Sequence, residues 1–348
     1  MAESRGSLAK RGEHAFLDRL CDRLRASAPG RESTRGLLVG PGDDAAVVEP
    51  GTAALAFTTD ALVEGVHFRS GWLAPDEIGA RAIAVNLSDL AAMGATPRWT
   101  LVSAIVPPDR SVSELDRILD ACAAASDAAG AAMIGGNLSR GDALSLTVTA
   151  IGAVEGPTLE RRGARPGDRL VVTGTLGAAA AAVDVWLDGG EPVAALRERF
   201  ARPVARLAAG RALAAAGARA AIDVSDGLLA DLGHLCRASG VGAVVERELL
   251  PRLAPVAIRD GSGSDFAATG GEDYELLAAL PRDFDDRAIA ELASACGVEL
   301  TVIGRCTEHG AGIRLVGADG DDHAPARGGF DHFAPGDAAP PGARRRRD

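Results

Sequence analysis

Aspartate recurs at short turns along this chain, each time among small residues and next to an apolar run. The segments with this pattern are Gly42-Asp43-Asp44, Thr58-Thr59-Asp60, Asn86-Leu87-Ser88-Asp89 and Asp223-Val224-Ser225-Asp226-Gly227. Carboxylates that gather in one site repel one another unless cations lie between them, and oxygen-rich sites of this kind suit Mg²⁺. The pattern therefore indicates a metal site that uses Asp43, Asp60, Asp89, Asp223 and Asp226.

A plainer interpretation exists for each aspartate taken alone, because Asp most often caps a helix or closes a turn. The aspartates for which we keep this interpretation are Asp44, Asp76 and Asp231. Asp223 and Asp226 differ, because they bracket Ser225 and place a hydroxyl and two carboxylates at one expected helix entrance. That arrangement suits a metal-bridged phosphate at a helix N-terminus.

Lysine is almost absent, since the chain holds only Lys10 in its N-terminal segment. This excludes several enzyme classes: a P-loop needs Gly-Lys-Ser/Thr, protein kinases need a lysine on a strand, and pyridoxal enzymes need a Schiff-base lysine. The net charge of −11 argues against a nucleic-acid surface, which requires clustered positive charge. An anionic substrate remains compatible with the carboxylates if metal ions bridge the two.

Length and composition favour two domains in a cytoplasmic protein. The chain has 348 residues, of which 47% are hydrophobic and 3% aromatic, so its cores must consist mainly of Ala, Val, Leu and Ile. Its five cysteines lack C-x-x-C or zinc spacing, as expected of reduced thiols in the cytoplasm. The longest apolar stretches are too short to span a bilayer, and the N-terminal segment lacks the apolar region of a signal peptide.

Apolar periodicity predicts helices and strands that alternate along the chain, which is typical of α/β or α+β architecture. The expected helices cover 13–27, 75 to the stop at Gly94, 112–129, 177–186, 202–216 and 228–239. The expected strands cover 37–39, 45–48, 54–59, 101–106, 144–154, 168–173, 220–224, 275–280 and 300–303. Asp60 is thereby placed at the C-terminal end of a strand, and Asn86 and Asp89 on one helix face. Glu155-Gly156-Pro157 separates an expected domain at 13–155 from one at 156–333, and 334–348 is expected to be a disordered tail.

Other segments have more than one interpretation. His67 is a lone histidine, for which a structural role competes with a binding role. Residues 270–275 carry three carboxylates next to two glycines and form either a polar turn or a site. Residues 328–333 place aromatic side chains just before the tail, where a base or heterocycle could stack on Phe330. Residues 171–177 lack the full G-x-G-x-x-G of a dinucleotide loop, which favours a plain strand, turn and helix.

Together and in this order, these segments resemble the thiamine-monophosphate kinase family. The resemblance is carried by Gly42-Asp43-Asp44-Ala45-Ala46, Thr58-Thr59-Asp60, Gly65-Val66-His67-Phe68, Asn86-Leu87-Ser88-Asp89-Leu90, Arg161 to Asp168, Asp223-Val224-Ser225-Asp226-Gly227, Gly270-Gly271-Glu272-Asp273-Tyr274-Glu275 and Gly329-Phe330-Asp331-His332-Phe333. It extends over most of the chain. It implies a two-domain aminoimidazole ribonucleotide synthetase-like fold, with an N-terminal α/β domain that binds ATP and Mg²⁺ and forms a homodimer through its sheet, and a C-terminal α+β domain.

The resemblance also implies an activity and a set of residues. Members of the family transfer the γ-phosphoryl group of ATP to thiamine monophosphate and form thiamine diphosphate. The implied Mg²⁺ ligands are Asp43, Thr58, Thr59, Asp60, Asp89, Asn137, Asp223 and Asp226. The implied ATP contacts are Gly136, Asn137, Arg161 and Ser225, and the implied substrate contacts are His67, Glu272 and Phe330. Because phosphoryl transfer needs mainly positioning and charge neutralisation, direct in-line transfer without a phosphoenzyme is expected.

The chain departs from the family at Asn137, where the family has a metal-binding aspartate after Gly-Gly. The amide keeps an oxygen but loses the charge, so a catalytically weakened nucleotide-binding protein is one alternative. Another ATP-dependent member of the superfamily is a second alternative. Selenophosphate synthetases usually carry a reactive cysteine near the N-terminus, whereas Cys21 lies in a helical pattern here, which counts against that member.

Overall fold

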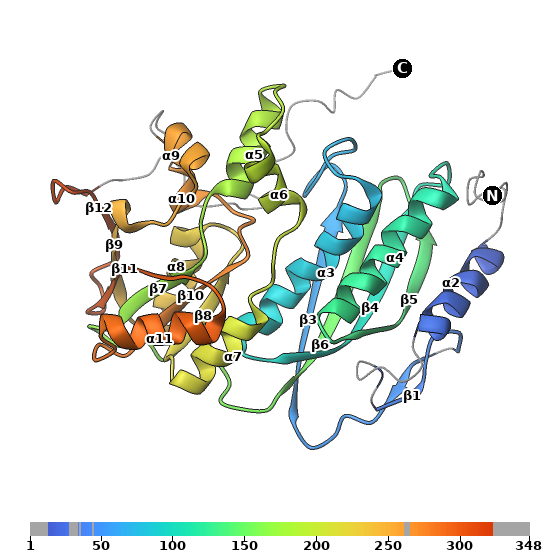
Figure 1. The fold of residues 1–348 in the computed structure, drawn as a ribbon, viewed down its shortest axis with the longest axis horizontal. Coiled ribbons are helices and arrows are strands. Elements are labelled where there is room, and N and C mark those ends of the chain that lie inside the picture. Colours follow the sequence, from blue (N-terminus) through green and yellow to red (C-terminus); the bar gives the residue numbers. More distant parts are fainter. Residues whose placement is uncertain (1–12, 28–33, 35, 44, 261–264, 323–348) are drawn as a thin grey trace. The chain divides into compact units, whose positions relative to one another are not determined.

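The structure is a computed structural model that describes residues 13–27, 34, 36–43, 45–260 and 265–322 (Figure 1). The chain divides into two compact units. The first comprises residues 1–90 and 95–155, and the second comprises 91–94 and 156–348. After the short segment 91–94, the chain passes from the first unit to the second between Glu155 and Gly156.

A four-stranded sheet lies at the centre of the first unit. In spatial order its strands are β3 (Ala54–Val63), β6 (Ser145–Val154), β4 (Thr96–Val106) and β5 (Ala132–Arg140). Strands β4 and β5 are parallel and are connected through α4 (Val112–Ala128), while the other neighbours are antiparallel. Helices α3 (Pro75–Ala92) and α4 cover one face of this sheet (Figure 1). The two helices can touch because Gly79 has no side chain, and a Cβ there would lie 2.0 Å from the carbonyl oxygen of Ile118.

The opposite face of this sheet is only partly covered. Side chains alternate between the two faces of a strand, so Val102, Ala104 and Val106 of β4 are buried while Ile105 is 40% exposed. Strand β3 places Phe57 on this second face, where it is 66% exposed. A hairpin of β1 (Leu37–Val39) and β2 (Val47–Val48) packs against the end of this face that carries Trp99 and Ile151.

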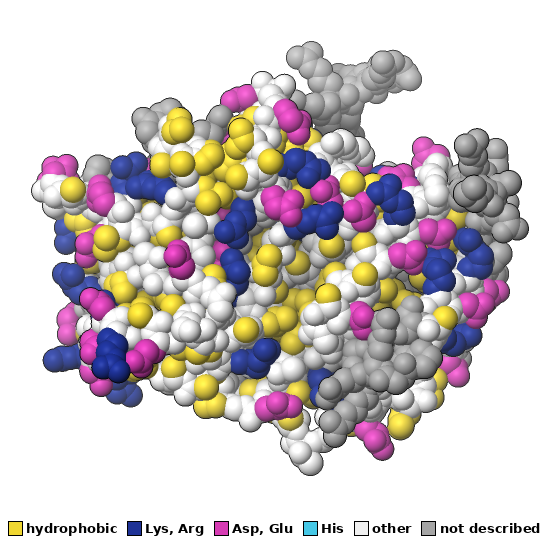
Figure 2. Space-filling model, in the orientation of Figure 1, with side chains coloured by type: hydrophobic (Ala, Val, Ile, Leu, Met, Phe, Trp, Pro, Cys, Tyr) yellow, Lys and Arg dark blue, Asp and Glu magenta, His cyan; other side chains and the backbone are white. Residues whose placement is uncertain are grey.

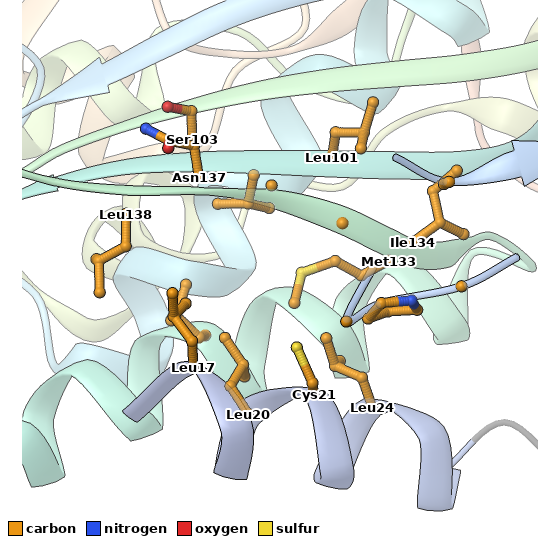
Figure 3. Close-up of a pocket in the computed structure, with 18 of the residues that line it drawn as sticks. Leu17, Leu20, Cys21, Leu24, Leu101, Ser103, Met133, Ile134, Asn137 and Leu138 are labelled. Carbon is orange, nitrogen blue, oxygen red and sulfur yellow. The ribbon is translucent and has the colours of Figure 1, made fainter. Parts of the chain in front are cut away.

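Helix α2 (Glu13–Ser27) lies beside α4 in the first unit. Arg23 fixes the pair, because its guanidinium donates to carboxylates of Asp116 and Asp120, each at 2.9 Å. The apolar side chains of α2 face the last strand of the sheet, β5 (Figure 3).

A six-stranded sheet forms the second unit. In spatial order its strands are β12 (Ile313–Val316), β9 (Gly242–Glu246), β11 (Leu300–Thr307), β7 (Arg169–Thr173), β10 (Glu275–Leu280) and β8 (Ala220–Val224). Only β12 and β9 run parallel among these neighbours. The helices are α5 (Ala178–Leu187), α6 (Ala194–Ala201), α7 (Leu207–Ala216), α8 (Leu228–Ser239), α9 (Ala254–Asp260), α10 (Phe266–Thr269) and α11 (Asp286–Cys296), with a 3₁₀ turn at Arg247–Leu249.

Two cores lie on the two faces of this sheet. On β10, Leu277 and Ala279 belong to the core that includes α8, whereas Leu276 and Ala278 belong to the core that includes α7 and α11. A strand that is buried on both faces has a continuous run of apolar residues, and β10 shows this pattern after Glu275.

Many expected elements are confirmed, and some with identical bounds: 13–27, 37–39, 220–224, 228–239 and 275–280. The expected helix at 202–216 is confirmed as α7 from Leu207 to Ala216, but its expected start is wrong, because α6 ends at Ala201 and α7 begins only at Leu207. Pro203 explains the break, since a proline disfavours helical geometry in the residue before it, and Arg202 has φ −133° and ψ 64°. Strands β5, β9 and β12 and helices α6, α9, α10 and α11 were not predicted.

The expected end of the strand at Thr59 is also wrong, because β3 continues to Val63 and Asp60 lies within it. None of the described helices is long and apolar enough to cross a membrane. Among the described residues on the face shown in Figure 2, Arg side chains are interspersed with Asp and Glu over both units and form no extended basic surface.

Candidate functional site

The helix-covered face of the first unit collects part of the predicted metal set. Thr58 and Asp60 are two residues apart on β3 and therefore share a face. The Thr58 hydroxyl donates to Oδ2 of Asp89 on α3 at 2.5 Å, which shows that this face is the one under α3. Asp89 is half-buried and Asp60 is exposed. The Thr58 hydroxyl and the Asp89 carboxylate thus meet beneath α3, and Asp60 lies on the same face of β3.

Thr59 and Asn137 belong to the opposite face. The Thr59 hydroxyl donates to the carbonyl oxygen of Val148 at 3.0 Å. Asn137 is paired in register with Ser103 of β4, and its Nδ2 donates to Oγ of Ser139 at 2.9 Å. Strands β3 and β5 are three steps apart in the sheet, which is about 14 Å at the usual strand spacing. Within one chain, the first unit therefore does not bring Asn137 to the Thr58 and Asp89 group.

Asn137 instead lines a cavity of about 770 Å³ together with Asp43 and Gly136. The cavity lies between α2, the segment 40–46 and the strands β4 and β5, all in the first unit. Figure 3 shows Leu138 and Met133 pointing towards α2, while Asn137 and Ser103 point to the other side of the strands. The cavity thus combines an apolar wall with a polar side.

The segment of Asp43 is tied to α2 by an arginine. Nε of Arg25 donates to the carbonyl oxygen of Pro41 at 2.9 Å. Gly42 has φ 109°, and a Cβ there would lie 2.0 Å from the Arg25 guanidinium. The positive φ favours glycine at this position, which explains the glycine before Asp43. The side chain of Asp43 is exposed at the cavity.

His67 lies in the loop between β3 and α3. Its Nδ1 accepts the backbone N–H of Val63 at 3.0 Å, so in the neutral ring the proton is on Nε2. Arg110 anchors the same loop, because it donates to Glu64 and to Glu114, each at 2.7 Å. A half-buried histidine held in one tautomer can donate a hydrogen bond to an anion or a carbonyl.

In the second unit, the predicted residues of the 223–227 segment lie at the junction of β8 and α8. Asp223 is buried at the end of β8, while Ser225 and Asp226 are half-buried in the turn that follows. The loop before β10 packs against this turn, because the N–H of Glu272 donates to the carbonyl of Ser225 at 2.7 Å and that of Tyr274 to Val224 at 2.8 Å. The structure therefore brings Asp223, Ser225, Asp226 and Glu272 together.

Two non-glycine residues of this loop have left-handed backbones. Glu272 has φ 73° and Tyr274 has φ 52°, and the Tyr274 hydroxyl donates to Oε2 of Glu272 at 3.1 Å. Such conformations persist only where surrounding contacts impose them, and they cluster at functional sites. The contacts to Ser225 and Val224 impose them here.

The three carboxylates predicted in 270–275 have separate surroundings. Glu272 lies over the 225–227 turn, whereas Asp273 accepts the N–H of Gly177 at 2.7 Å before α5. Burial raises the pKa of Asp273 well above its usual value, and the Glu275 charge adds to the shift, while the backbone bonds oppose it. Glu275 is 1% exposed and paired with Arg206. One segment therefore supplies one candidate ligand and two structural carboxylates.

Asp231 was predicted to cap a helix or close a turn, and from a position inside α8 it does bind the turn that precedes this helix. Its Oδ2 accepts three backbone N–H groups, from Ser225 at 3.0 Å and from Asp226 and Gly227 at 3.1 Å each. Burial raises the pKa of Asp231 to about 7, and the nearby charges of Asp223 and Asp226 add to the shift. The signal in the sequence was an acidic residue in the first turn of an otherwise apolar helix segment.

Arg161 is exposed and lies close to α8. Its carbonyl oxygen accepts the Ser239 hydroxyl at 2.9 Å. The pKa of His234 is lowered by desolvation and by the positive charges of Arg237 and Arg161, whereas the charge of Asp226 opposes the shift. Arg161, Arg237 and Asp226 therefore all lie close enough to His234 to influence its charge. Phe330, Asp44 and the tail lie outside the described residues.

Among the described residues, the candidate metal ligands offer Mg²⁺ pairs of carboxylates and no larger group. Within the part of the chain that the structure describes, no three His, Cys, Asp or Glu side chains form a ready metal cage. Mg²⁺ usually takes one or two carboxylates and completes its shell with water and substrate phosphates. Pairs such as Asp60 with Asp89 and Asp223 with Asp226 suit that requirement, because all their donors are hard oxygens.

Comparisons with known proteins agree with the two-unit fold. Residues 42–154 match the model of the family "AIR synthase related protein, N-terminal domain", and residues 165–316 match that of "AIR synthase related protein, C-terminal domain". The chain is 39% identical to a thiamine-monophosphate kinase of Salmonella typhimurium over 93% of this chain and 98% of the relative.

Two solved structures extend this similarity. A crystal structure of thiamine-monophosphate kinase from Stenotrophomonas maltophilia superposes with a TM-score of 0.77 at 40% identity, covering 87% of this chain and 96% of the other. A second structure, AaThiL complexed with AMPPCP and TMP, has a TM-score of 0.71 at 32% identity and covers 94% of this chain and 99% of the other.

Proposed function

The chain belongs to the thiamine-monophosphate kinases within the AIR synthase related proteins, and from this premise we propose how it forms thiamine diphosphate from thiamine monophosphate and ATP. The observation that carries the proposal is the turn 223–227, locked between α8 and the loop of Glu272. This turn places two carboxylates and a hydroxyl at a helix entrance, an arrangement that suits a phosphate bound through a metal ion.

The reaction requires two anions to approach each other. The attacking atom is a phosphate oxygen of thiamine monophosphate, which is largely ionised at neutral pH because its second pKa is about 6. A general base is therefore unnecessary, and positioning with charge neutralisation is the main requirement. We expect direct in-line transfer, and labelled phosphate retained on the protein after incubation with ATP alone would contradict it.

When bound, Mg²⁺ would supply the positive charge that neutralises the phosphates. The residues that would hold it are Thr58, Asp60 and Asp89 on one face of the first unit, Asp43, Thr59 and Asn137 elsewhere in that unit, and Asp223 and Asp226 in the second unit. Arg161 would add a fixed cation to the triphosphate, because it lies, like Asp226, close enough to His234 to influence its charge.

We infer the remaining contacts from the family resemblance. Gly136 and Asn137 line the 770 Å³ cavity, where ATP would contact the polar side. Ser225 would contact ATP from the 225–227 turn. His67 would donate from Nε2 to thiamine monophosphate, Glu272 would accept from it, and Phe330 would stack on its ring.

A homodimer through the partly covered face of the first sheet is part of the proposal. Phe57 and Ile105 are exposed on this face, and Leu101 lies on it as well. Asn137 shares the face, so a second copy would also approach the polar side of the cavity. Phe57→Asp should convert the dimer to a monomer in light scattering; a wild-type protein that is already monomeric would refute this arrangement.

We also infer a cytoplasmic location, since ATP is the co-substrate and all five cysteines are unpaired. The test of the function is formation of thiamine diphosphate from ATP and thiamine monophosphate across a Mg²⁺ titration. Mg²⁺-dependent product supports the kinase. ATP binding without product would favour the weakened nucleotide-binding protein, for which the neutral Asn137 is the supporting feature.

A further inference from the structure

We propose that Asp231 is a positioning residue that holds the turn 225–227 in the conformation that presents Asp223, Ser225 and Asp226 to the nucleotide and its metal ions. This inference rests on the proposed function for its meaning. Its own evidence is geometric and concerns residues of the second unit alone.

The first observation is the convergence of donors on one oxygen. Oδ2 of Asp231 accepts the N–H groups of Ser225, Asp226 and Gly227 at 3.0–3.1 Å. The side chain is 3% exposed, so water does not replace these bonds readily. Backbone donors at the start of a helix have no partner within the helix, and here one buried carboxylate satisfies three of them.

The second observation is that the opposite side of the turn is fixed as well. The carbonyl of Ser225 accepts the N–H of Glu272 at 2.7 Å. Gly227 has φ 119°, and a Cβ there would lie 2.5 Å from the carbonyl oxygen of Thr269. The turn therefore has the loop of Glu272 on one side and Asp231 on the other, and its path is set by both.

The third observation separates Asp231 from the candidate metal ligands. Its Oδ2 is occupied by the three N–H groups, and the side chain is buried within α8, whereas Ser225 and Asp226 are half-buried in the turn. Asp231 thus acts through the backbone of Asp226. The property that matters is an acceptor oxygen at the position of Oδ2, which asparagine can also supply.

The experiment compares Asp231→Ala, Asp231→Asn and Asp231→Glu in the full-length protein. The readouts are Mg·ADP affinity by isothermal titration calorimetry and the Mg²⁺ concentration for half-maximal rate. Asp231→Ala is expected to weaken Mg·ADP binding and raise the Mg²⁺ midpoint by about 10-fold or more, the range found when a residue behind a metal ligand is removed. For Asp231→Asn, both the Mg·ADP affinity and the Mg²⁺ midpoint should stay within about 3-fold of wild type, which is well below the change expected for Asp231→Ala.

Asp168→Ala is the matched control. Asp168 is also fully buried in the second unit and accepts the N–H of Arg165 at 2.7 Å and a guanidinium N–H of Arg219 at 3.0 Å. It should lower the melting temperature without moving the Mg²⁺ midpoint. If Asp231→Ala does not fold, Asp231→Glu takes its place, because the longer side chain keeps an acceptor but displaces the turn.

Three results would overturn the proposal: an unchanged Mg·ADP affinity in both the Ala and Glu variants, an Asn variant as impaired as Ala, or an equal effect of Asp168→Ala. If wild-type protein forms no thiamine diphosphate yet binds Mg·ADP, the proposed function fails and the calorimetry still decides the role of Asp231. If wild-type protein binds no Mg·ADP, both proposals are wrong.

Discussion

The buried ion pair of Glu275 and Arg206 allows a quantitative test of how the second unit is held together. Glu275 is 1% exposed. Its Oε2 accepts Nε of Arg206 at 2.6 Å and the hydroxyl of Thr173 at 2.6 Å, and its Oε1 accepts Nη2 of Arg206 at 2.5 Å. The change Arg206→Ala removes both guanidinium hydrogen bonds. The buried carboxylate then keeps the Thr173 hydroxyl as a donor and Arg199 as the remaining nearby cation.

The expected loss of stability follows from this geometry. Removing one partner of a buried ion pair typically destabilises a protein by about 3–5 kcal/mol, because the remaining charge stays desolvated. Nη1 of Arg199 lies 3.5 Å from Oε1 and offsets part of this penalty, so we expect the lower end, about 3 kcal/mol. For a unit of this size, that corresponds to a decrease in melting temperature of about 6–12 °C.

The assay is differential scanning calorimetry, following the transition of the second unit, which contains the whole pair. The control is Arg287→Ala, which breaks an exposed pair with Glu291 on α11 and should change stability by no more than about 0.5 kcal/mol. The double change Arg206→Met with Glu275→Leu should recover most of the loss, because no buried charge remains. A melting temperature for Arg206→Ala equal to that of the control would refute the assignment of a buried, charge-dependent pair.

Three further predictions concern the first unit and the cysteines. Asp89→Asn should lower turnover about 100-fold at saturating Mg²⁺, because a charge in the Thr58 group is lost, and a near-normal steady-state rate would remove Asp89 from the metal site. Asn137→Asp should lower the Mg²⁺ concentration needed for half-maximal rate, since it adds a fixed charge; an increase would show that the site is adapted to the amide. Burial raises the pKa of four thiols, to about 12 or about 11, so these thiols should stay protonated and unreactive at pH 8. A thiol reagent should then modify only Cys21 in the native protein and all five cysteines after denaturation. Rapid reaction of a second thiol in the native protein would contradict this prediction. The four thiols are Cys122, Cys236, Cys296 and Cys306.

The sequence was sufficient for elements whose apolar pattern agrees with their burial. Strand β10 reads as a continuous apolar run because both of its faces are covered, and α8 shows helical spacing because one of its faces is. Strand β5 was missed because its Gly135-Gly136-Asn137 core resembles a loop. Its place in the sheet comes from pairing with β4, which lies about thirty residues away in the sequence and has no local signature.

The sequence proposes candidate site residues by their type, but it does not give their arrangement. The separation of Asn137 from Thr58 and Asp89 depends on strand order and on which face each side chain takes, and both are properties of the paired sheet. Asp231 was recognisable as a turn-stabilising aspartate, but the three donors it would satisfy could not be named before the path of the turn was known.

The acidic residues around the turn 223–227 therefore form two groups. One group stabilises the fold through hydrogen bonds or an ion pair, and the other is proposed to bind metal ions. Asp231 accepts hydrogen bonds from backbone N–H groups, and Glu275 is paired with the charge of Arg206. Asp223 and Asp226 lie at the turn, and their charges add to the effect of burial in raising the pKa of Asp231. Mg²⁺ that arrives with the nucleotide would add positive charge beside Asp223 and Asp226 and reduce the repulsion between carboxylates at this turn. Binding of Mg²⁺ with ATP should then stabilise the second unit more than ATP alone.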